Sequence, residues 1–542
     1  MRGFLMQATR SHGFSTLLAV LSLFFIGFFS TPAVATAQGA AFKQAVAEAA
    51  SKDKDISAFY QSTGYEGIWT GNKSRDKARR AELLKALKNS ADHGLPADQY
   101  AVDVLTSRLK SARTPRDLGQ LEVELSRVFL KYAADIQTGA LIPSNVDQHI
   151  VRTVPYRNRQ SYLVNFEKSS PAGFFKALPP RTKEYNALMK HKLVLEQLLA
   201  KGGWGNTVNA NKLEPGDSGA AVIALRDRLV RMGYLKRNAG KTYDTAMTDA
   251  VIRFQADHGL AQDGIVGAGT LGEINVSMQQ RLQSVIVAME RERWLNKDRG
   301  ARHIEVNLTD FTAKIIDNGK ITFSTRSVIG ARDAKRQSPE FSDQMEFMII
   351  NPSWFVPRSI AIGEYLPELQ QDPYAVQHLI ITDRSGRQVD RANVDFAKYT
   401  RQSFPYAMRQ PPSRSNALGL VKFMFPNKYN IYLHDTPAKK LFGRETRAYS
   451  HGCIRLADPF DFAYALLAVQ TNDPKGFFQS KLATGKEVQV NLEKPVPVHI
   501  IYRTAFANGK SQMQYRRDIY GRDSRIWEAL SQAGVELRAV QG

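Results

Sequence analysis

Hydrophobic residues in the N-terminal third of the chain recur at intervals of three and four positions. Leu121, Leu125, Phe129 and Tyr132 belong to one such series, which predicts an amphipathic helix with a single apolar face. Short stretches with glycine and proline interrupt the pattern, as turns between helices do. We therefore expect a helical domain over residues 38–205 and assign it a structural role, since nothing in its sequence points to chemistry.

A glycine-rich linker leads to a compact unit that we expect over residues 206–277. Apolar residues at helical spacing predict two amphipathic helices in this unit. The first lies around Leu225, and the second, with Thr245 as its cap, lies around Phe254. A helical bridge is then expected from Met278 to Leu295.

Strand signals replace the helical pattern beyond this bridge. Polar and apolar residues alternate over 303–308, and Asp317-Asn318-Gly319 joins two apolar runs in the way that a tight hairpin does. Closing strands are expected over 488–492 and 498–502. The fold class that we predict is a multidomain α+β protein whose β-rich domain extends over residues 278–542.

Residues 358–426 interrupt the β-rich domain with a polar segment rich in proline, arginine and glutamine. A segment of this length inside a compact domain is typical of a lid or an inserted subdomain. We expect a lid over the site, with a purely structural elaboration as the alternative. Trp354 lies just before this segment, where it forms either a wall of a substrate pocket or part of a core.

Composition and charge indicate where the protein works. The 542 residues carry a formal net charge of +22, which suits an acidic partner. Residues 1–37 read as a secretory signal, with an apolar run over 17–29 and Ala35-Thr36-Ala37 before the expected cleavage point. A retained membrane anchor is the alternative. Export in either form excludes nucleic acid and leaves wall carboxylates or membrane phosphates as partners, unless the basic residues are merely solvated.

The chain contains a single cysteine, Cys453, so an intramolecular disulfide is excluded. A thiol with histidines nearby is what a cysteine acyltransferase needs, and His434 stands 19 positions upstream. We expect His451 and Arg455 to lower the pKa of the thiol through their positive charge. Gly452 lets the backbone approach a substrate closely. The alternative is a buried structural cysteine.

Residues 430–434 alternate as a strand does, which predicts that Tyr432 and His434 share one face. Tyr432 is then either a pocket residue or a packed aromatic. His434 is the candidate base, and His451 is the other candidate. Zinc is not expected, because His451 and Cys453 are separated by one residue and no CxxC or HExxH motif is present. We expect no cofactor.

The motif His434-Asp435-Thr436-Pro437, followed by Ser450-His451-Gly452-Cys453-Ile454-Arg455-Leu456, resembles the signature of the L,D-transpeptidases. These are cysteine enzymes with a YkuD-like catalytic domain that remodel bacterial peptidoglycan, and the whole chain resembles their large multidomain periplasmic branch. The resemblance implies a scaffold domain over 38–205 and a three-helix peptidoglycan-binding module over 206–277, although such a module can also serve as a spacer or docking surface. It further implies that the segment 358–426 caps the active site.

The same resemblance implies a mechanism. Cys453 attacks the carbonyl of the third residue of a donor stem tetrapeptide, and a thioester forms as D-alanine leaves. His434 is the base, oriented by the carbonyl of Asp435 or of a neighbour. The N–H groups of Gly452 and Cys453 hold the oxyanion, and Arg455 orders the loop, binds a substrate carboxylate or forms a buried ion pair. The supporting or substrate-binding residues implied in this way are Asp435, Tyr432, Ser450, His451, Gly452, Arg455 and Trp354.

The implied function is the formation of 3-3 cross-links between stem peptides, which serves cell wall biogenesis and cell shape. The implied location is the periplasm of a Gram-negative bacterium, where inner-membrane or wall-synthesis proteins would be partners. Water or a protein lysine could instead resolve the acyl-enzyme, giving an L,D-carboxypeptidase or a lipoprotein-attaching transferase. A non-catalytic wall-binding scaffold is the remaining alternative.

Overall fold

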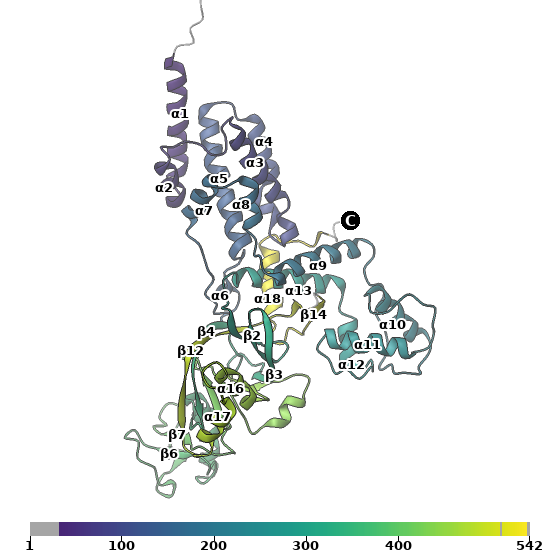
Figure 1. Ribbon diagram of the computed structural model, residues 1–542, viewed down its shortest axis with the longest axis vertical. Helices are drawn as coiled ribbons and strands as arrows, with labels where there is room; N and C mark the ends of the chain where they lie inside the picture. The colour runs from purple at the N-terminus through teal and green to yellow at the C-terminus, as the bar shows by residue number, and fades with distance from the viewer. Residues whose placement is uncertain (1–31, 510–511, 539–542) are drawn as a thin grey trace, which may run out of the picture.

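The computed structural model describes residues 32–509 and 512–538 and shows an elongated molecule. A helical body forms one end, a β-rich domain forms the other, and a small helical lobe projects from the region between them (Figure 1). Of the predicted signal, residues 1–31 lie outside the described residues, and helix α1 (Pro32–Ala50) begins within its last part. Among the described residues, no helix is both long enough and apolar enough to cross a membrane.

Helices α1 to α5, α7 and α8 build the helical body around a core rich in aromatic residues. The longest, α5 (Pro115–Thr138), begins with a capping box of Thr114 and Asp117 and carries the predicted apolar face. Its Glu122 is buried and accepts hydrogen bonds from the N–H groups of residues 68–70, which ties that loop to the helix. The other helices of this body are α2 (Lys54–Ser62), α3 (Ser74–Lys88), α4 (Val102–Ser111), α7 (Arg159–Lys168) and α8 (Pro171–Ala177). The short helix α6 (Pro143–Val146) lies outside this core.

A second core joins the helical body to the β-rich domain. Three helices contribute to it: α9 (Lys183–Ala200), α13 (Met278–Trp294) and α18 (Arg522–Gln532). The hairpin of β13 (Ala505–Ala507) and β14 (Met513–Tyr515) completes it. α13 is the helix predicted over 278–295. Because these segments come from different expected domains, a shared core connects the parts of the molecule.

The last turns of α13 carry four consecutive charged residues that are all buried. They are Glu290, Arg291, Glu292 and Arg293. Arg291 forms ion pairs with Glu340 of the β-rich domain at 2.7 Å and with Asp523 of α18 at 2.8 Å. Arg293 donates to the backbone carbonyl of His93 in the helical body at 2.8 Å. The charges of one helix therefore reach three separate parts of the fold.

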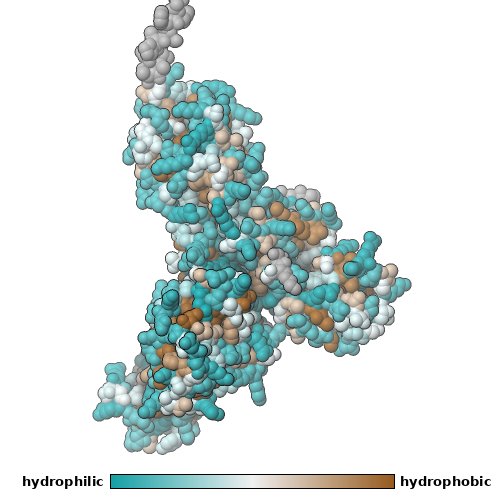
Figure 2. Space-filling view, in the orientation of Figure 1, coloured by the Kyte–Doolittle hydropathy of each residue, from teal (hydrophilic) through white to brown (hydrophobic). Residues whose placement is uncertain are grey.

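The small lobe consists of α10 (Ala220–Arg231), α11 (Thr245–Asp257) and α12 (Ala268–Ile274) around a core of its own. The cap of α11 is Asp244, whose side chain accepts from the N–H of Met247 at 2.9 Å, so the predicted cap at Thr245 is wrong by one residue. Hydrophilic residues cover most of the lobe and of the neighbouring surfaces seen in Figure 2.

The β-rich domain is built on a nine-stranded sheet in the order β10-β3-β11-β9-β8-β4-β12-β1-β2. The predicted hairpin is confirmed: β2 (Thr312–Asp317) and β3 (Lys320–Gly330) meet at Asn318 and Gly319, which have φ values of 50° and 76°. Helices α16 (Pro459–Leu467) and α17 (Pro474–Leu482) pack against the sheet. The remaining strands are β1 (Arg302–Asn307), β4 (Phe341–Ile350), β8 (Val421–Met424), β9 (Leu433–His434), β10 (Ala448–Ser450), β11 (Ile454–Leu456) and β12 (Val488–Ile501).

Two strands differ in length from the prediction, although the predicted fold class is confirmed. β12 runs through both expected closing strands as one strand, with a register shift between Asn491 and Val496. β9 contains only residues 433–434, because the chain reaches it through a turn in which Asn430 has a φ of 54°.

The segment 358–426 forms a distinct subdomain at the far tip of the β-rich domain (Figure 1). β6 (Ile380–Thr382) and β7 (Ala407–Gln410) pair with β5 (Trp354–Phe355) in a three-stranded sheet. Helix α14 (Arg358–Ile360), the π-helical turn η3 (Ala361–Tyr365) and α15 (Leu366–Gln371) cover a separate small core. An inserted subdomain is therefore present at the predicted place.

The ion pairs of α13 lead to a stability prediction. Replacing Arg291 by methionine leaves Asp523 buried without this partner, and breaking a buried ion pair costs about 3–5 kcal/mol. We expect a loss of this size in the free energy of unfolding, measured by urea titration with tryptophan fluorescence. As a control, Arg387→Ala breaks an ion pair whose arginine side chain is 83% exposed, and should cost less than about 1 kcal/mol. Equal losses in the two variants would contradict the structural role of α13.

Candidate active site

The two predicted catalytic residues lie at neighbouring strands within the sheet: His434 ends β9, and Cys453 directly precedes β11. β9 and β11 run parallel, with Leu433 opposite Ile454 and His434 opposite Arg455. The N–H of Ile454 donates to the carbonyl of Tyr432 at 3.1 Å. Since Cys453 directly precedes β11, this register sets it beside Tyr432, one step along the strand pair from His434.

The turn that carries the thiol is held by hydrogen bonds from two serines. Ser450 Oγ donates to the carbonyl of Cys453 at 2.5 Å and accepts from the N–H of Gly452 at 3.2 Å. Ser338 Oγ donates to the carbonyl of Gly452 at 2.6 Å. Gly452 has a φ of 110°, a conformation that side-chain-bearing residues rarely adopt. The N–H of Gly452 is one of the two predicted to bind the oxyanion. To do so, it would have to break its hydrogen bond to Ser450 Oγ.

Burial controls the ionisation of Cys453. The half-buried thiol lies 3.4 Å from the carbonyl of Asn430. Burial raises the pKa of Cys453 to about 11, although hydrogen bonds from Tyr432 and the charges of Arg455 and Lys422 act in the opposite direction. Arg455 therefore acts on the thiol in the predicted direction, whereas His451 is not among the largest causes of its pKa shift. The pKa is nevertheless raised overall in the protein without substrate, because desolvation outweighs the nearby positive charges.

His434 is buried, with 4% of its surface exposed. Its Nδ1 lies 2.5 Å from the carbonyl of Asp435, and since a carbonyl only accepts, Nδ1 donates in this contact. The carbonyl of Leu418 is a second backbone acceptor beside the imidazole. Burial and the charge of Arg455 lower the pKa of His434 to about 3. The imidazole is therefore neutral at physiological pH and able to accept a proton.

Asp435 holds the loop that follows His434. Its carboxylate accepts from the N–H of Leu420 at 2.9 Å and from the N–H of Thr436 at 2.7 Å, and it pairs with Lys439 at 2.7 Å. These contacts fix the backbone carbonyl that orients the imidazole. Asp435 thus acts on His434 through its backbone, while its side chain binds the loop.

Tyr432 is the residue that touches both catalytic candidates. Its side chain hydrogen-bonds to Cys453, and its ring centroid lies 5.6 Å from that of His434. It also packs against both the core of the sheet and the core of the inserted subdomain. In the described part of the chain, no hydrogen bond joins Cys453 to His434 directly, as is common in active sites without substrate.

Two cations line this centre. Arg455 is half-buried, no ion pair is found for it among the described residues, and its Nε is buried without a hydrogen-bond partner. Lys422 on β8 lies opposite His434, and burial lowers its pKa while the nearby charges of Glu487 and Cys453 raise it. Sequence reasoning missed Lys422 as a site residue. The alternation of polar and apolar residues over 421–424 indicates a strand that contains Lys422. Only the pairing of this strand with β9 shows that Lys422 lies at the site.

The inserted subdomain reaches the site through His451. Its Nε2 lies 2.5 Å from the carboxylate of Glu364 on η3, an ion pair when the imidazole is protonated. His451 is the alternative candidate for the base, and its contact with Glu364 was not predicted from the sequence. Trp354 is 8% exposed and packs in the core of the subdomain, with its ring 6.3 Å from that of Tyr365. Its position suits packing, and its role in a substrate pocket stays a prediction.

Three segments of the chain match known families. Residues 54–191 match the family described as "Scaffold domain", residues 218–274 match the "Putative peptidoglycan binding domain", and residues 301–490 match the "L,D-transpeptidase catalytic domain". The chain therefore carries a catalytic domain of the L,D-transpeptidase family, together with a scaffold domain and a domain of the peptidoglycan-binding type. The family predicted from the cysteine motif is confirmed.

A relative from Haemophilus influenzae, described as "Putative L,D-transpeptidase", is 32% identical over 227 residues. The match covers 41% of this chain and 45% of the relative, so less than half of that protein's length is matched.

Two solved L,D-transpeptidase structures are also similar. The one from Xylanimonas cellulosilytica is 14% identical and the match covers 55% of this chain and 100% of that one, with a TM-score of 0.17. The one from Stackebrandtia nassauensis is 14% identical, and the match covers 55% of this chain and 97% of that one, with a TM-score of 0.21. TM-scores this low carry no argument about the arrangement of this chain.

The raised thiol pKa predicts how Cys453 reacts in the absence of substrate. Because thiolate is the reactive form, alkylation by iodoacetamide should speed up about tenfold per pH unit from pH 7 towards the thiol pKa of about 11. Cys453 is the only cysteine, so the mass of the whole protein reports its alkylation alone. An unstructured cysteine peptide, whose rate levels off near pH 9, is the control. A rate for the protein that levels off below pH 9 would show that the site activates its thiol without substrate.

The contact of Glu364 with His451 predicts an effect on access to the site. We expect Glu364→Gln to raise the alkylation rate of Cys453 by a bulky maleimide about twofold to fivefold, because an exposed ion pair contributes at most about 1 kcal/mol. Labelling by the smaller iodoacetamide should change less, and high salt should reduce the difference. Glu368→Gln, which removes the same charge from the same subdomain, is the control. Equal rates in the two variants would show that this contact does not restrain the subdomain.

Proposed function

We propose that this protein is a peptidoglycan L,D-transpeptidase that forms 3-3 cross-links through a thioester on Cys453. The observation that carries the proposal is the arrangement of four residues at the adjacent strands β9 and β11 in the part of the chain that matches the L,D-transpeptidase catalytic domain. His434 and Arg455 lie on these strands, and Tyr432 and Cys453 directly precede them. That membership supports a peptidoglycan-modifying enzyme in general. The choice of donor, acceptor and catalytic residues is our proposal.

In the first half-reaction, the Cys453 thiol loses its proton to Nε2 of His434 as Sγ attacks the carbonyl carbon of the third residue of a donor tetrapeptide. A C–S bond forms, the bond to the terminal D-alanine breaks, and the imidazolium returns its proton to the leaving amine. The free-state pKa values of about 11 for Cys453 and about 3 for His434 oppose this proton transfer. Proton transfer would therefore accompany substrate binding and attack, when the developing charges gain new partners.

In the second half-reaction, the side-chain amine of an acceptor stem attacks the thioester. The C–N bond forms and the C–S bond breaks, while His434 takes the proton of the amine and passes it back to the thiolate. One amide bond replaces another, so the exchange needs no external energy source. Resolution by water would release a tripeptide instead and would make the protein a carboxypeptidase.

Arg455 would bind a carboxylate of the donor stem. Its Nε is buried without a hydrogen-bond partner, and such a group is costly unless a ligand supplies the acceptor. Planar guanidinium groups recognise carboxylates through two parallel hydrogen bonds, which would orient the stem beside Cys453. The inserted subdomain, in contact through Glu364 and His451, would cover the bound stem and exclude water from the thioester.

The domains support a proposal about location and partners. A catalytic domain and a module that are both of peptidoglycan-associated type support a place at the cell wall. We propose the periplasm, with residues 1–37 as the export signal, and donor and acceptor stem peptides as the partners of the site. The module over 218–274 would hold the protein on the wall polymer.

The test is mass spectrometry of the exported protein incubated with a disaccharide tetrapeptide. We expect a thioester adduct on the protein, loss of D-alanine, and a dimer linked through two third-position residues. Cys453→Ala should abolish all three, and His434→Gln should lower kcat/KM by about 10²–10⁴-fold.

Each other outcome points away from the proposal. Tripeptide as the sole product, even with added acceptor, would assign a carboxypeptidase. Transfer to a lipoprotein lysine in preference to a stem amine would assign protein attachment. An unchanged tetrapeptide that still binds the protein would leave a wall-binding scaffold.

A further inference from the structure

A cleft of roughly 970 Å³ lies where the small lobe, the sheet and the C-terminal hairpin meet. Its walls include residues 258–262 after α11, the loop around Asp310, and residues 442–447 before β10. Cys453 and His434 are not among the residues that line it, so this cleft is separate from the candidate active site.

The lining of the cleft is strongly basic. Ten lysine and arginine side chains contribute to it, against four aspartate and glutamate side chains. Four of the basic residues, including Arg503 and Lys314, form ion pairs with acidic side chains. Among the described residues, the other six have no carboxylate partner at ion-pair distance; these are Lys183, Arg326, Arg332, Arg444, Arg447 and Arg516.

The arginines of the walls are held in place by the surrounding backbone. Arg516 donates to the carbonyl of Asp257 at 2.9 Å and stacks on the ring of Phe506. Arg447 donates to the carbonyls of Ser327 and Arg444 at 3.2 Å and 2.9 Å. Because these guanidinium groups are already ordered, binding a ligand costs them little conformational entropy.

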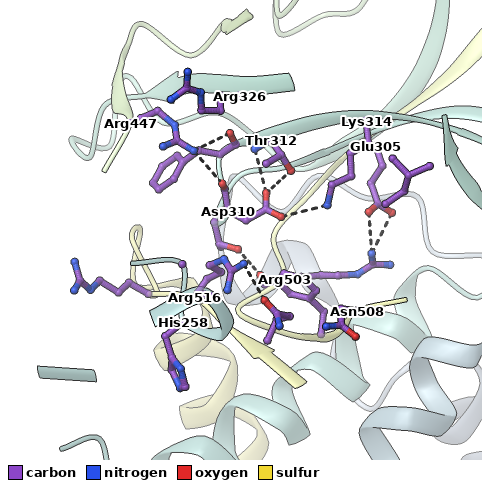
Figure 3. Close-up of a pocket in the computed structure, with 18 of the residues that line it drawn as sticks. His258, Glu305, Asp310, Thr312, Lys314, Arg326, Arg447, Arg503, Asn508 and Arg516 are labelled. Carbon is purple, nitrogen blue, oxygen red and sulfur yellow. Dashed lines mark hydrogen bonds and ion pairs between the residues drawn. The ribbon is translucent and has the colours of Figure 1, made fainter. Parts of the chain in front are cut away.

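Like charges face the same open space. Figure 3 shows Arg326 and Arg447 on one side of the cleft and Arg516 with His258 on the other. Burial and the charge of Arg326 lower the pKa of Arg447 to about 10, while Asp310 raises it. Positive groups held this close repel each other, and an anion between them would remove the repulsion.

We infer that this cleft binds the carboxylates of a peptidoglycan stem peptide at a distance from Cys453, an inference that rests on the proposed function. Guanidinium groups match carboxylates in shape, and the volume of the cleft suits a peptide better than a single ion. Three of the acidic side chains, Glu305, Asp310 and Glu445, are already paired with lining cations, so the unpaired cations act on the ligand. Because these unpaired arginines stand on two sides of the cleft (Figure 3), they suit the separate carboxylates of a stem peptide.

The cleft lies between the small lobe and the segment that leads to Cys453. Residues 442–447 form part of its wall and lead directly into β10 and the turn of Cys453. The opposite wall comes from the lobe of peptidoglycan-binding type. A stem bound here would hold the wall polymer between the lobe and the catalytic domain while other stems of the polymer enter the active site.

The test measures binding by calorimetry with full-length protein whose single cysteine has been alkylated, so that the active site is blocked. The probe is a soluble disaccharide tetrapeptide. We expect Arg326→Gln with Arg332→Gln to weaken binding about tenfold, since each exposed arginine can make one charge-assisted contact. Lys110→Gln with Arg113→Gln, which removes the same charge from the exposed surface of the scaffold domain, should leave binding unchanged.

A second arm changes the ligand. Amidation of the stem carboxylates should weaken binding to the parent protein by a similar factor. Equal binding by the cleft variant and its control, or tighter binding of inorganic polyphosphate than of the muropeptide, would overturn the inference. The thioester adduct of the unalkylated parent is measured separately, so failure of the cleft and failure of the proposed activity are distinguishable.

Discussion

Four charged side chains in a row are buried at the end of α13, and each would be costly there without a partner. The partners come from different regions: Arg291 meets Glu340 and Asp523, and Arg293 meets the helical body. An ion pair in a dry interior forms only when both groups are correctly placed. These buried charges therefore find their partners only when the helical body, the sheet and the C-terminal helix are assembled together.

The candidate active site combines an uncharged thiol with an uncharged imidazole. Burial is the largest cause of both states, because it disfavours the charged form of each group and so raises the pKa of Cys453 and lowers that of His434. The positive charges of Arg455 and Lys422 act in the opposite direction on Cys453, because they stabilise negative charge on its sulfur. In the protein without substrate, both groups of the site are therefore uncharged at neutral pH.

Local patterns predicted much of the fold. The hairpin at Asn318-Gly319 and the helix from Met278 needed only turn chemistry and periodicity. The motif around Cys453 predicted the family and named His434. The pairing of Lys422 with His434 could not be predicted, because it depends on how β8 aligns with β9. The contact between Glu364 and His451 bridges 87 residues of sequence and depends on how the inserted subdomain folds back.

The sequence by itself determined many of the elements, the order of the domains and the family that the thiol motif indicates, since these depend on residues close together in the chain. The tertiary structure decided the ionisation of Cys453, because the pKa of a group depends on how deeply it is buried. It also decided which of the many arginines keep a carboxylate partner. Arg503 pairs with Glu292, whereas Arg326 and Arg516 face an open cleft, and only the packing of distant segments makes that difference.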